Sequence, residues 1–391
     1  MKSEWTKKML SDIADFNPRE TIKKGAIAKK IPMDVLRPFY RDIPYYVEEC
    51  FSGGTKFRNG DTIMARITPC LENGKTAQVS ILNDGEVGFG STEYIVFRAK
   101  EGIADKDYLY YLVCSPEVRE PAIKSMVGSS GRQRVQTDVV KNLEIDVPPL
   151  VEQEKIGSFL KAFDDKIALN DRINKNLEQQ AQAVYYKMFS EINTVPVELS
   201  SIIDVRDGTH DSPKAQAKGY HLITSKHLLP FGVDKVSANH ISKADFDKIN
   251  ERSLVETQDI LMSMIGTIGL ISYIPYETVD FAIKNVALFK TSHTPELAYY
   301  FLCYLKSEKT LQHIGKCLAG STQKYISLGE LRKMPIYPPT TNEIREFNCL
   351  VKPMFEKIVS RTYENALLAE IRDSLLPKLM SGELDVSNID L

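Results

Sequence analysis

The sequence predicts an α+β protein with an internal repeat: two α/β globular domains with β-sheet cores, separated by two long antiparallel coiled-coil helices. Three observations support this fold class. Apolar residues recur at alternating steps of four and three over residues 156–188, and a matching series lies 191 residues later, over 347–379. Each series follows a stretch of mixed globular sequence. Both globular stretches contain strand-like and helix-like segments in the same order.

The first globular domain, residues 1–149, is rich in short β-type segments. Three of them carry β-branched and aromatic residues between Gly, Asn and Asp breaks: residues 61–67, 75–82 and 93–99. Residues 107–116 predict a helix that ends at Ser115-Pro116. The domain closes at Pro148-Pro149, and the second proline stands just before the first long helix, where its fixed φ is tolerated.

Long helices are expected over residues 150–192 and over residues 341–391, the latter with a C-terminal segment. Steps of four and three keep one stripe of side chains on one face of a helix, where it packs against another helix. A helix of about 35–40 residues is about 50–60 Å long. So long an apolar stripe would be exposed unless the two helices paired with each other. The expected seam residues are Ile156, Leu160, Phe163, Ile167, Asn170, Asn174, Leu177, Met354, Ile358, Arg361, Asn365 and Leu368.

Polar residues interrupt both seams near their middles. Asn170 and Asn174 lie in the first series, and Arg361 and Asn365 lie in the second. They are either solvated positions in a loose stretch or a device that fixes the register of the two helices, since buried polar seam residues specify alignment at some cost in stability. Pro353 lies inside the second seam and is expected to kink the helix or to mark its beginning.

The second globular domain, residues 193–340, repeats the order of the first. The corresponding segments are 259–265 for 61–67, 282–290 for 91–99, 296–307 for 107–116, and 319–327 for 128–136. Pro338-Pro339 corresponds to the first proline pair. The offset between matching segments drifts, so the loops differ in length while the elements persist.

Composition excludes several classes of protein. The 391 residues are 43 % hydrophobic and 26 % charged, as in ordinary soluble proteins. No run approaches the roughly 18 apolar residues of a membrane span, and the N-terminus is too polar for a secretory signal. The six cysteines are scattered, which argues against a disulfide framework or a metal site and fits the cytoplasm. The net charge of −2 means that any nucleic-acid-binding surface must be local or supplied by other subunits.

Catalytic motifs are incomplete. Gly74-Lys75-Thr76 resembles the end of a phosphate-binding loop, but Pro69 stands where the loop needs its first glycine. Residues 146–149 resemble an amino-methyltransferase motif but lack the aromatic residue after the prolines, and no glycine-rich cofactor motif follows a strand. All six histidines lie in the second half, so no catalytic histidine is shared by both repeats. His210, with acidic neighbours on both sides, suggests a metal site or a base, but a locally capped turn is the favoured interpretation.

Both domains share a polar loop that combines small residues with basic or amide side chains. One loop is residues 129–134 and the other is residues 320–324. Such loops can place backbone amides, guanidinium groups and side-chain amides against phosphates and base edges. An ordinary solvated loop is the alternative interpretation.

The sequence resembles, along essentially its full length, the specificity (S) subunits of type I restriction-modification systems. Six stretches carry the resemblance: ARITPCLENGKTA (65–77), GFGSTEYIVFR (88–98), DGTHDSP (207–213), DILMSMIGTIG (259–269), GSTQKYIS (320–327) and LLPKLMSGEL (375–384). The resemblance implies two target-recognition domains, residues 1–149 and 193–340, each of which reads one half of a split DNA sequence. The long helices would set the gap between the halves and dock two methyltransferase (M) subunits.

The resemblance also implies partners and site residues. The M subunits would carry S-adenosylmethionine and the adenine-methylating site, and restriction (R) subunits would join the full complex; this chain would itself hold no cofactor or metal and no catalytic residue. These stretches, the polar loops shared by the repeats and other loops of the second domain give these candidate DNA-binding residues: Arg66, Thr68, Glu72, Asn73, Lys75, Ser91, Thr92, Ser129, Arg132, Gln133, Arg134, Thr209, His210, Lys226, His227, Thr267, Lys284, Asn285, Ser321, Thr322, Gln323 and Lys324. Among them, Arg66 could pair bidentately with guanine.

Two other classes of function remain as alternatives. The near-zero net charge fits an assembly scaffold whose domains bind only proteins. An enzyme of nucleic-acid chemistry that acts alone is disfavoured by the missing cofactor and metal motifs.

Overall fold

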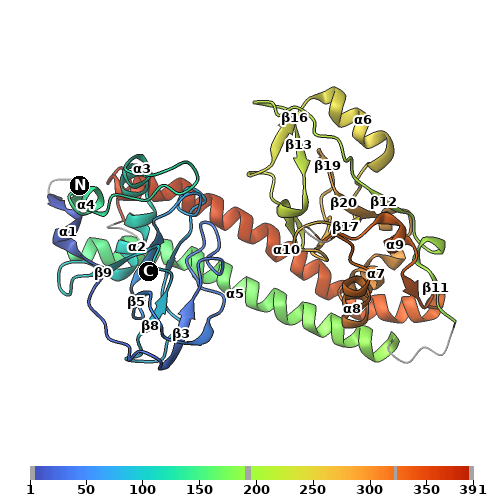
Figure 1. Cartoon of the computed structure of the whole chain (residues 1–391), viewed down its shortest axis with the longest axis horizontal. Coiled ribbons are helices and arrows are strands. Elements are labelled where there is room, and N and C mark those ends of the chain that lie inside the picture. The colour runs from blue at the N-terminus through green and yellow to red at the C-terminus, as the bar shows by residue number, and fades with distance from the viewer. Residues whose placement is uncertain (1–4, 190–194, 321–323, 387–391) are drawn as a thin grey trace. The chain divides into compact units, whose positions relative to one another are not determined.

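The computed structural model describes residues 5–189, 195–320 and 324–386 (Figure 1). The chain divides into two compact units, Met1–Asn170 with Glu364–Leu391, and Asp171–Tyr363. Each unit contains part of both long helices, α5 (Leu150–Phe189) and α10 (Thr341–Met380). Among the described residues, no helix is both long enough and apolar enough to cross a membrane.

The first unit contains two four-stranded sheets and a small two-stranded one. The strand orders are β2-β9-β6-β7, β4-β3-β8-β5 and β1-β10, and every pairing is antiparallel except that of β3 with β8. The strands are β1 (Thr6–Met9), β2 (Ala14–Phe16), β3 (Ile27–Ile31), β4 (Val47–Cys50), β5 (Thr55–Phe57), β6 (Thr62–Ala65), β7 (Thr76–Gln78), β8 (Gly88–Gly90), β9 (Tyr94–Ala99) and β10 (Glu144–Val147). The short helices are α1 (Leu10–Ile13), α2 (Lys106–Cys114), α3 (Pro116–Lys124) and α4 (Thr137–Lys141).

The second unit repeats this topology. Its larger sheets have the orders β12-β20-β17-β18 and β16-β13-β19, with β13 and β19 parallel, and its small sheets pair β11 with β21 and β14 with β15. The strands are β11 (Val197–Glu198), β12 (Val205–Asp207), β13 (Tyr220–Ile223), β14 (Leu228–Leu229), β15 (Gly232–Val233), β16 (Asn239–Ile241), β17 (Ile260–Ser263), β18 (Ile271–Tyr273), β19 (Phe281–Ile283), β20 (Val286–Phe289) and β21 (Pro335–Ile336). The helices are α6 (Lys243–Ser253), α7 (Ala298–Leu305), α8 (Glu308–Lys316) and α9 (Leu328–Arg332), with short 3-10 turns η2 (Leu199–Ser201), η3 (Ser225–His227), η4 (Thr291–His293) and η5 (Pro295–Leu297).

The central strand of each unit is buried on both faces. In β9, Ile95 and Phe97 belong to an apolar cluster with the helices, whereas Tyr94 and Val96 belong to a cluster with the second sheet. Alternate residues of β20 divide between two clusters in the same way. Each unit is therefore layered as helices, sheet and second sheet, and the predicted α+β repeat is confirmed.

A buried ion pair recurs at matching positions of the two sheets. In the first unit the Arg98 guanidinium donates two hydrogen bonds of 2.7 Å to the Asp61 carboxylate. In the second, the Lys290 ammonium donates to Asp259 at 2.6 Å. Both carboxylates are almost fully buried, so each requires its cation. These four residues lie in segments that match between the two repeats, and the structure shows that they form pairs.

The two long helices pack against each other antiparallel within the first unit. The Asp164 carboxylate of α5 binds the Arg372 guanidinium of α10. Six residues further along α5, the Asn170 side-chain amide donates at 2.8 Å to Asn365, which precedes Arg372 by seven residues in α10. Asn170 is 1 % exposed and also donates to Glu364 at 2.8 Å. This buried contact supports the interpretation of the polar seam residues as a register device.

The same helices pack together in the second unit through aromatic rings. The Phe347 ring of α10 lies 6.3 Å from that of Tyr185 and 5.3 Å from that of Phe189. All twelve expected seam residues are buried or half-buried, as packing between helices requires. Pro353 is exposed and α10 runs through it, so this proline does not mark the beginning of the helix.

The units differ in several elements, of which the longest is a helix of the second unit. α6 of the second unit packs on β19, and its Phe246 ring stacks on Tyr220 with centroids 3.9 Å apart. The sequence pattern does not predict this helix, because its residues are mostly polar and only Ile249 and Ser253 are buried. The described part of the first unit has no helix at the matching place between β4 and β5.

Candidate nucleic-acid interface

The polar loop of the first unit is a hairpin attached to the end of the central strand β6. Residues 127–134, called hairpin 1, pair with Ile67 through the backbone of Arg134. The Thr68 amide donates to the Gln133 carbonyl at 3.0 Å, and the Gln133 amide donates to the Thr68 hydroxyl at 2.9 Å. Thr68 is 9 % exposed, so its hydroxyl holds the hairpin and does not face solvent, contrary to the expected contact.

Two guanidinium groups fix the base of hairpin 1. Arg66 donates from Nη2 to the Val135 carbonyl at 3.1 Å. Arg134 donates from Nη2 and Nε to the Glu93 carboxylate at 2.7 and 2.9 Å, and this hydrogen bond raises the pKa of Arg134. Arg132, nearer the tip, is exposed. The side chain of Arg66 is thus occupied within the protein, and Arg132 is the arginine of hairpin 1 that is best placed to meet a phosphate.

The link between β8 and β9 completes this cluster. The Ser91 hydroxyl accepts from the Glu93 amide at 3.1 Å, the Glu93 carbonyl accepts from the Arg66 amide at 2.9 Å, and Thr92 is exposed. Seven of the expected residues therefore come from three separate parts of the sequence and gather at one edge of the first unit: Arg66, Thr68, Ser91, Thr92, Arg132, Gln133 and Arg134. Ser129, at the tip of hairpin 1, is exposed.

The turn that follows Thr68 contributes less than expected. Glu72 and Asn73 are exposed, and the Glu72 carbonyl accepts from Arg119 Nη2 at 2.7 Å. The Lys75 ammonium is directed inward and donates to the Met33 carbonyl at 2.9 Å. Lys75 therefore tethers the turn, and its position does not fit the expected DNA contact.

A second hairpin in the second unit occupies the matching place. The Tyr325 backbone pairs with Ala319 and with Ile265, just as Arg134 of hairpin 1 pairs with Val127 and with Ile67. Lys324, before Tyr325, and Thr267, after β17, are exposed. The expected residues Ser321, Thr322 and Gln323 lie outside the described part of the chain.

The loop after β12 lies against the link between β19 and β20. Thr209 forms a backbone bridge with Lys284. His210 contacts Asn285 Oδ1 through Nδ1 at 2.7 Å and Asp207 Oδ2 through Nε2 at 2.9 Å. Asn285 has a φ of +53°, a left-handed conformation that asparagine tolerates.

These contacts place four expected residues of the second unit together: Thr209, His210, Lys284 and Asn285. The Lys284 ammonium donates to Ser212 at 2.5 Å, and the Asp211 amide donates to the Thr209 hydroxyl at 3.1 Å. The second contact is the local capping that the sequence favoured for this turn. Within the described residues, no group of three or more His, Cys, Asp and Glu side chains is arranged to hold a metal ion.

Lys226 is exposed, but its neighbour His227 does not fit the expected DNA contact. His227 is 2 % exposed, and its Nδ1 accepts from the Thr224 amide at 3.0 Å. The histidine therefore stabilises the turn η3 from within. Burial lowers the pKa of His227, because the charged imidazolium would lose solvation there.

This burial makes the stability of the chain sensitive to acid. The unfolded state takes up a proton on His227 near pH 6.5, whereas the folded state binds it only at lower pH. We therefore expect the free energy of unfolding to fall as pH decreases from about 7 to about 5. His227→Asn keeps an acceptor without titrating and should reduce this slope. Equal slopes for wild type and His227→Asn in chemical denaturation would contradict the prediction.

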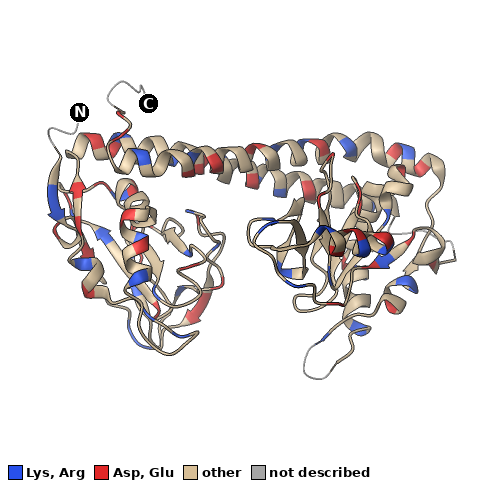
Figure 2. Cartoon of the chain, turned by 90° about the horizontal axis from the view of Figure 1, so that it is seen from above, with Lys and Arg blue, Asp and Glu red and all other residues tan. Residues whose placement is uncertain are grey.

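Two residues of the site were not predicted from the sequence. The Glu93 carboxylate binds Arg134, which lies 41 residues later in the sequence. The Asp207 carboxylate binds both His210 and Arg252. In the sequence, Asp207 stands out only as an acidic neighbour of His210 in the 207–213 stretch. Lys and Arg residues are interspersed with Asp and Glu residues along both long helices (Figure 2), so neither long helix is uniformly basic.

Comparison with known proteins assigns the chain to a family. The sequence profile described as the type I restriction modification DNA specificity domain matches residues 2–179 and 193–348. The chain belongs to this family. The two specificity domains thus correspond to the two repeats. A type I restriction enzyme specificity subunit of Methanocaldococcus jannaschii is 26 % identical over 316 residues, which cover 74 % of this chain and 71 % of the relative.

Further relatives agree with a specificity subunit of two such domains. The HindI specificity subunit of Haemophilus influenzae is 24 % identical over 403 residues, covering 84 % of this chain and 87 % of the relative. The crystal structure of the type I restriction-modification S subunit from M. genitalium covers 96 % of both chains at 16 % identity with a TM-score of 0.52. This structural likeness supports the fold of the specificity domains.

Proposed function

We propose that this chain is the DNA-recognition subunit of a type I restriction-modification complex, and that each specificity domain reads one half of an asymmetric, bipartite target. The observation that carries the proposal is that a hairpin pairs with the residue that follows the matching strand, β6 or β17, in both domains but displays different side chains. Hairpin 1 displays Arg132, whereas the second domain displays Lys324 with the His210–Asn285 pair. Unlike side chains on a repeated scaffold favour two different half-sites.

The remaining parts of the complex follow from the same proposal. The paired helices α5 and α10 set the spacing between the half-sites and dock two methyltransferase subunits, which carry S-adenosylmethionine and methylate adenine. Restriction subunits join the complete complex in the cytoplasm, and this chain contributes recognition without catalysis. The relatives support this assignment, since their names describe specificity subunits of type I restriction enzymes.

The decisive experiment maps modified adenines by single-molecule sequencing in cells with and without this gene, with the methyltransferase subunit present in both. One split motif should be methylated only when the chain is present. Footprinting of the reconstituted complex provides the second readout. A complex that protects no specific bases would show that the chain is an assembly scaffold and would overturn the proposal.

Exposed cations of the two hairpins should contribute contacts to phosphates. Arg132→Ala and Lys324→Ala are each expected to weaken DNA binding and to reduce the slope of log affinity against log salt by about 0.9 for each lost contact. Both side chains are exposed, so the thermal stability should not change. Lys333→Ala, an exposed lysine after α9, is a matched control. Unchanged affinity and salt slope in both variants would refute the assignment of the hairpins.

A further inference from the structure

A chain of four side chains in the second unit joins α6 to the link between β19 and β20. The Arg252 guanidinium, near the end of α6, binds one oxygen of the Asp207 carboxylate at the end of β12. The other oxygen of this carboxylate lies 2.9 Å from His210 Nε2. Through its second nitrogen, Nδ1, the His210 ring contacts Asn285 Oδ1 at 2.7 Å. Asn285 is therefore held at the end of a series of polar contacts that begins on a helix.

The backbone also holds Asn285 in place. Its amide donates to the Thr209 carbonyl at 3.1 Å, and the Thr209 amide donates to the Ile283 carbonyl at 3.0 Å. Gly208 permits this close approach, because a Cβ at that position would collide with the Ile283 carbonyl oxygen. The φ of Asn285 is +53°, in a region that asparagine adopts more readily than most residues. The side chain is thus mounted on a backbone that is fixed before any ligand arrives.

The ring of His210 sets the rotation of the Asn285 side-chain amide. The Asp207 carboxylate, paired with its arginine, only accepts hydrogen bonds, so His210 Nε2 carries a proton and donates to it. Nδ1 binds Oδ1 of Asn285 when Nδ1 is protonated, and it would bind Nδ2 when it is not. In both cases the side-chain amide keeps at least one N–H donor and one acceptor lone pair outside the contact with the ring.

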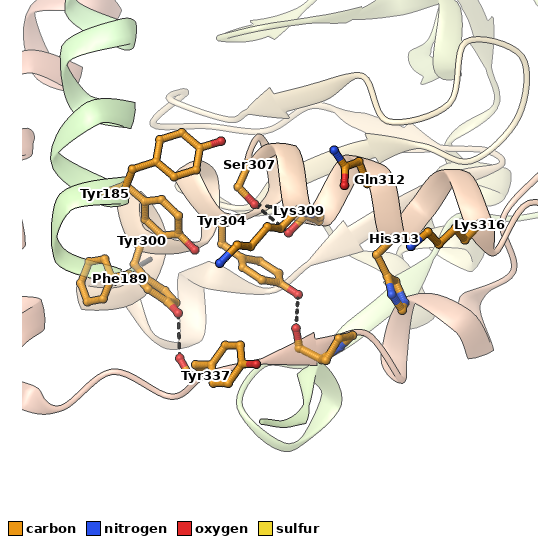
Figure 3. Close-up of a pocket in the computed structure, with 13 residues that line it drawn as sticks. Tyr185, Phe189, Tyr300, Tyr304, Ser307, Lys309, Gln312, His313, Lys316 and Tyr337 are labelled. Atoms are coloured by element: carbon orange, nitrogen blue, oxygen red, sulfur yellow. Dashed lines mark hydrogen bonds between the residues drawn. The ribbon is translucent and has the colours of Figure 1, made fainter. Parts of the chain in front are cut away.

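No described residue uses this remaining polar capacity. Within the described chain, the only hydrogen-bond partner of the Asn285 side chain is His210. The amide nitrogen is not among the buried polar atoms that lack a partner, so solvent reaches it. By contrast, the Tyr300 hydroxyl beside the end of α5 is engaged within the protein and donates to the Tyr337 carbonyl at 2.8 Å (Figure 3). A ligand can therefore pair with Asn285 without breaking a contact of the protein.

A fixed side-chain amide with one donor and one acceptor is complementary to adenine. In the major groove, adenine presents N7 as an acceptor and its N6 amino group as a donor, and asparagine pairs with both at once. Other bases present a different pattern at this edge. An amide that is already oriented loses less entropy on binding and cannot turn to suit another base.

The first unit carries a different group at the matching place. Asn285 lies four residues before Phe289 of β20. Glu93 lies four residues before Phe97, the residue of β9 that matches Phe289. The Glu93 carboxylate is paired with Arg134, so this place offers a bound carboxylate in the first unit and a free amide in the second.

We propose that Asn285 reads an adenine in the half-site of the second domain, and that His210 is a positioning residue that fixes the Asn285 amide. Asp207 and Arg252 hold His210 in turn. The inference rests on the proposed function, because it names the group that reads one base pair of the target. His210 acts through Asn285 and does not itself contact a base.

The test measures binding of the reconstituted complex to its methylated motif and to every single-base-pair substitution of that motif. Asn285→Gly removes the amide without strain, because glycine adopts a positive φ freely. Discrimination should fall about tenfold at one A·T pair, and the other half of the motif, an internal control, should be unchanged. Asn285→Asp, which keeps the acceptor for His210 but has no N–H donor, should lose discrimination at the same base pair.

A double-mutant cycle tests the positioning role. His210→Ala should weaken discrimination at the same base pair, and combining it with Asn285→Gly should add no further loss, since the two residues act as one unit. A purely structural role of His210 would weaken binding to all sequences alike. That result, additive losses, retained discrimination in both Asn285 variants, or relaxation at a pair other than A·T would each overturn the proposal. A wild-type complex that selects no sequence would overturn the proposed function and this inference with it.

Discussion

Inserting seven residues into α5 and seven into α10 is expected to lengthen the spacer of the recognised DNA sequence by about three base pairs. Seven residues add about 10 Å at the helical rise of about 1.5 Å per residue, and B-DNA rises about 3.4 Å per base pair. A seven-residue insertion also keeps the seam on one face of each helix. Methylation mapping of the variant complex measures the spacer directly.

The insertions belong between Asp171 and Arg172 and between Tyr363 and Glu364, beside the polar contacts of the seam. A variant with the insertion in α5 alone is the matched control, because it shifts the helices out of register and should lose methylation altogether. Recovery of the original spacer in the double insertion would show that the helices do not set the distance.

Replacing Arg372 by methionine is expected to lower the free energy of unfolding by about 3–5 kcal/mol. Arg372 and Asp164 are each about 6 % exposed, and Asp164 also accepts from the Tyr111 hydroxyl at 2.5 Å. Burial raises the pKa of Asp164 and the Arg372 guanidinium opposes this shift. Without the arginine, a carboxylate remains buried without its main cation. Chemical denaturation of the full chain measures the loss.

Two controls make this prediction specific. Asp164→Leu combined with Arg372→Met leaves no uncompensated charge and should recover most of the loss. The deficit of Arg372→Met should also shrink as pH is lowered, because a carboxyl group with a raised folded-state pKa binds its proton more readily in the folded state. A deficit independent of pH, with no recovery in the double variant, would assign the effect to lost packing alone.

The periodic and repeated features of the fold could be predicted from the sequence. The seam follows from spacing alone, and β6, β9, β17 and β20 follow from their apolar composition. The second sheet of each unit was not predicted, because β3, β4 and β8 are short and interrupted by lysine, glutamate and glycine. Their pairing depends on contacts between distant segments, such as Lys30 with Phe89.

The candidate site was predictable only as a set of loops. Sequence similarity between the repeats located both hairpins, but it did not show which side chains are engaged within the protein. Thr68, Lys75 and His227 each bond the backbone of another loop residue, and Arg66 is tied to Val135. These side chains look like surface groups in the sequence because burial and long-range hydrogen bonds leave no local pattern.

The ion pair between Asp164 and Arg372 also bears on chain selectivity. With the 191-residue offset, Arg372 corresponds to Ala181 and Asp164 corresponds to Phe355, and both counterparts lie in the apolar cluster of the second unit. If α5 from two molecules associated homotypically, each Asp164 would face an alanine and lose its counter-ion. Pairing of α5 with α10 is the arrangement that neutralises this carboxylate, so the ion pair discriminates against association of two α5 helices despite the seam that the repeated helices share.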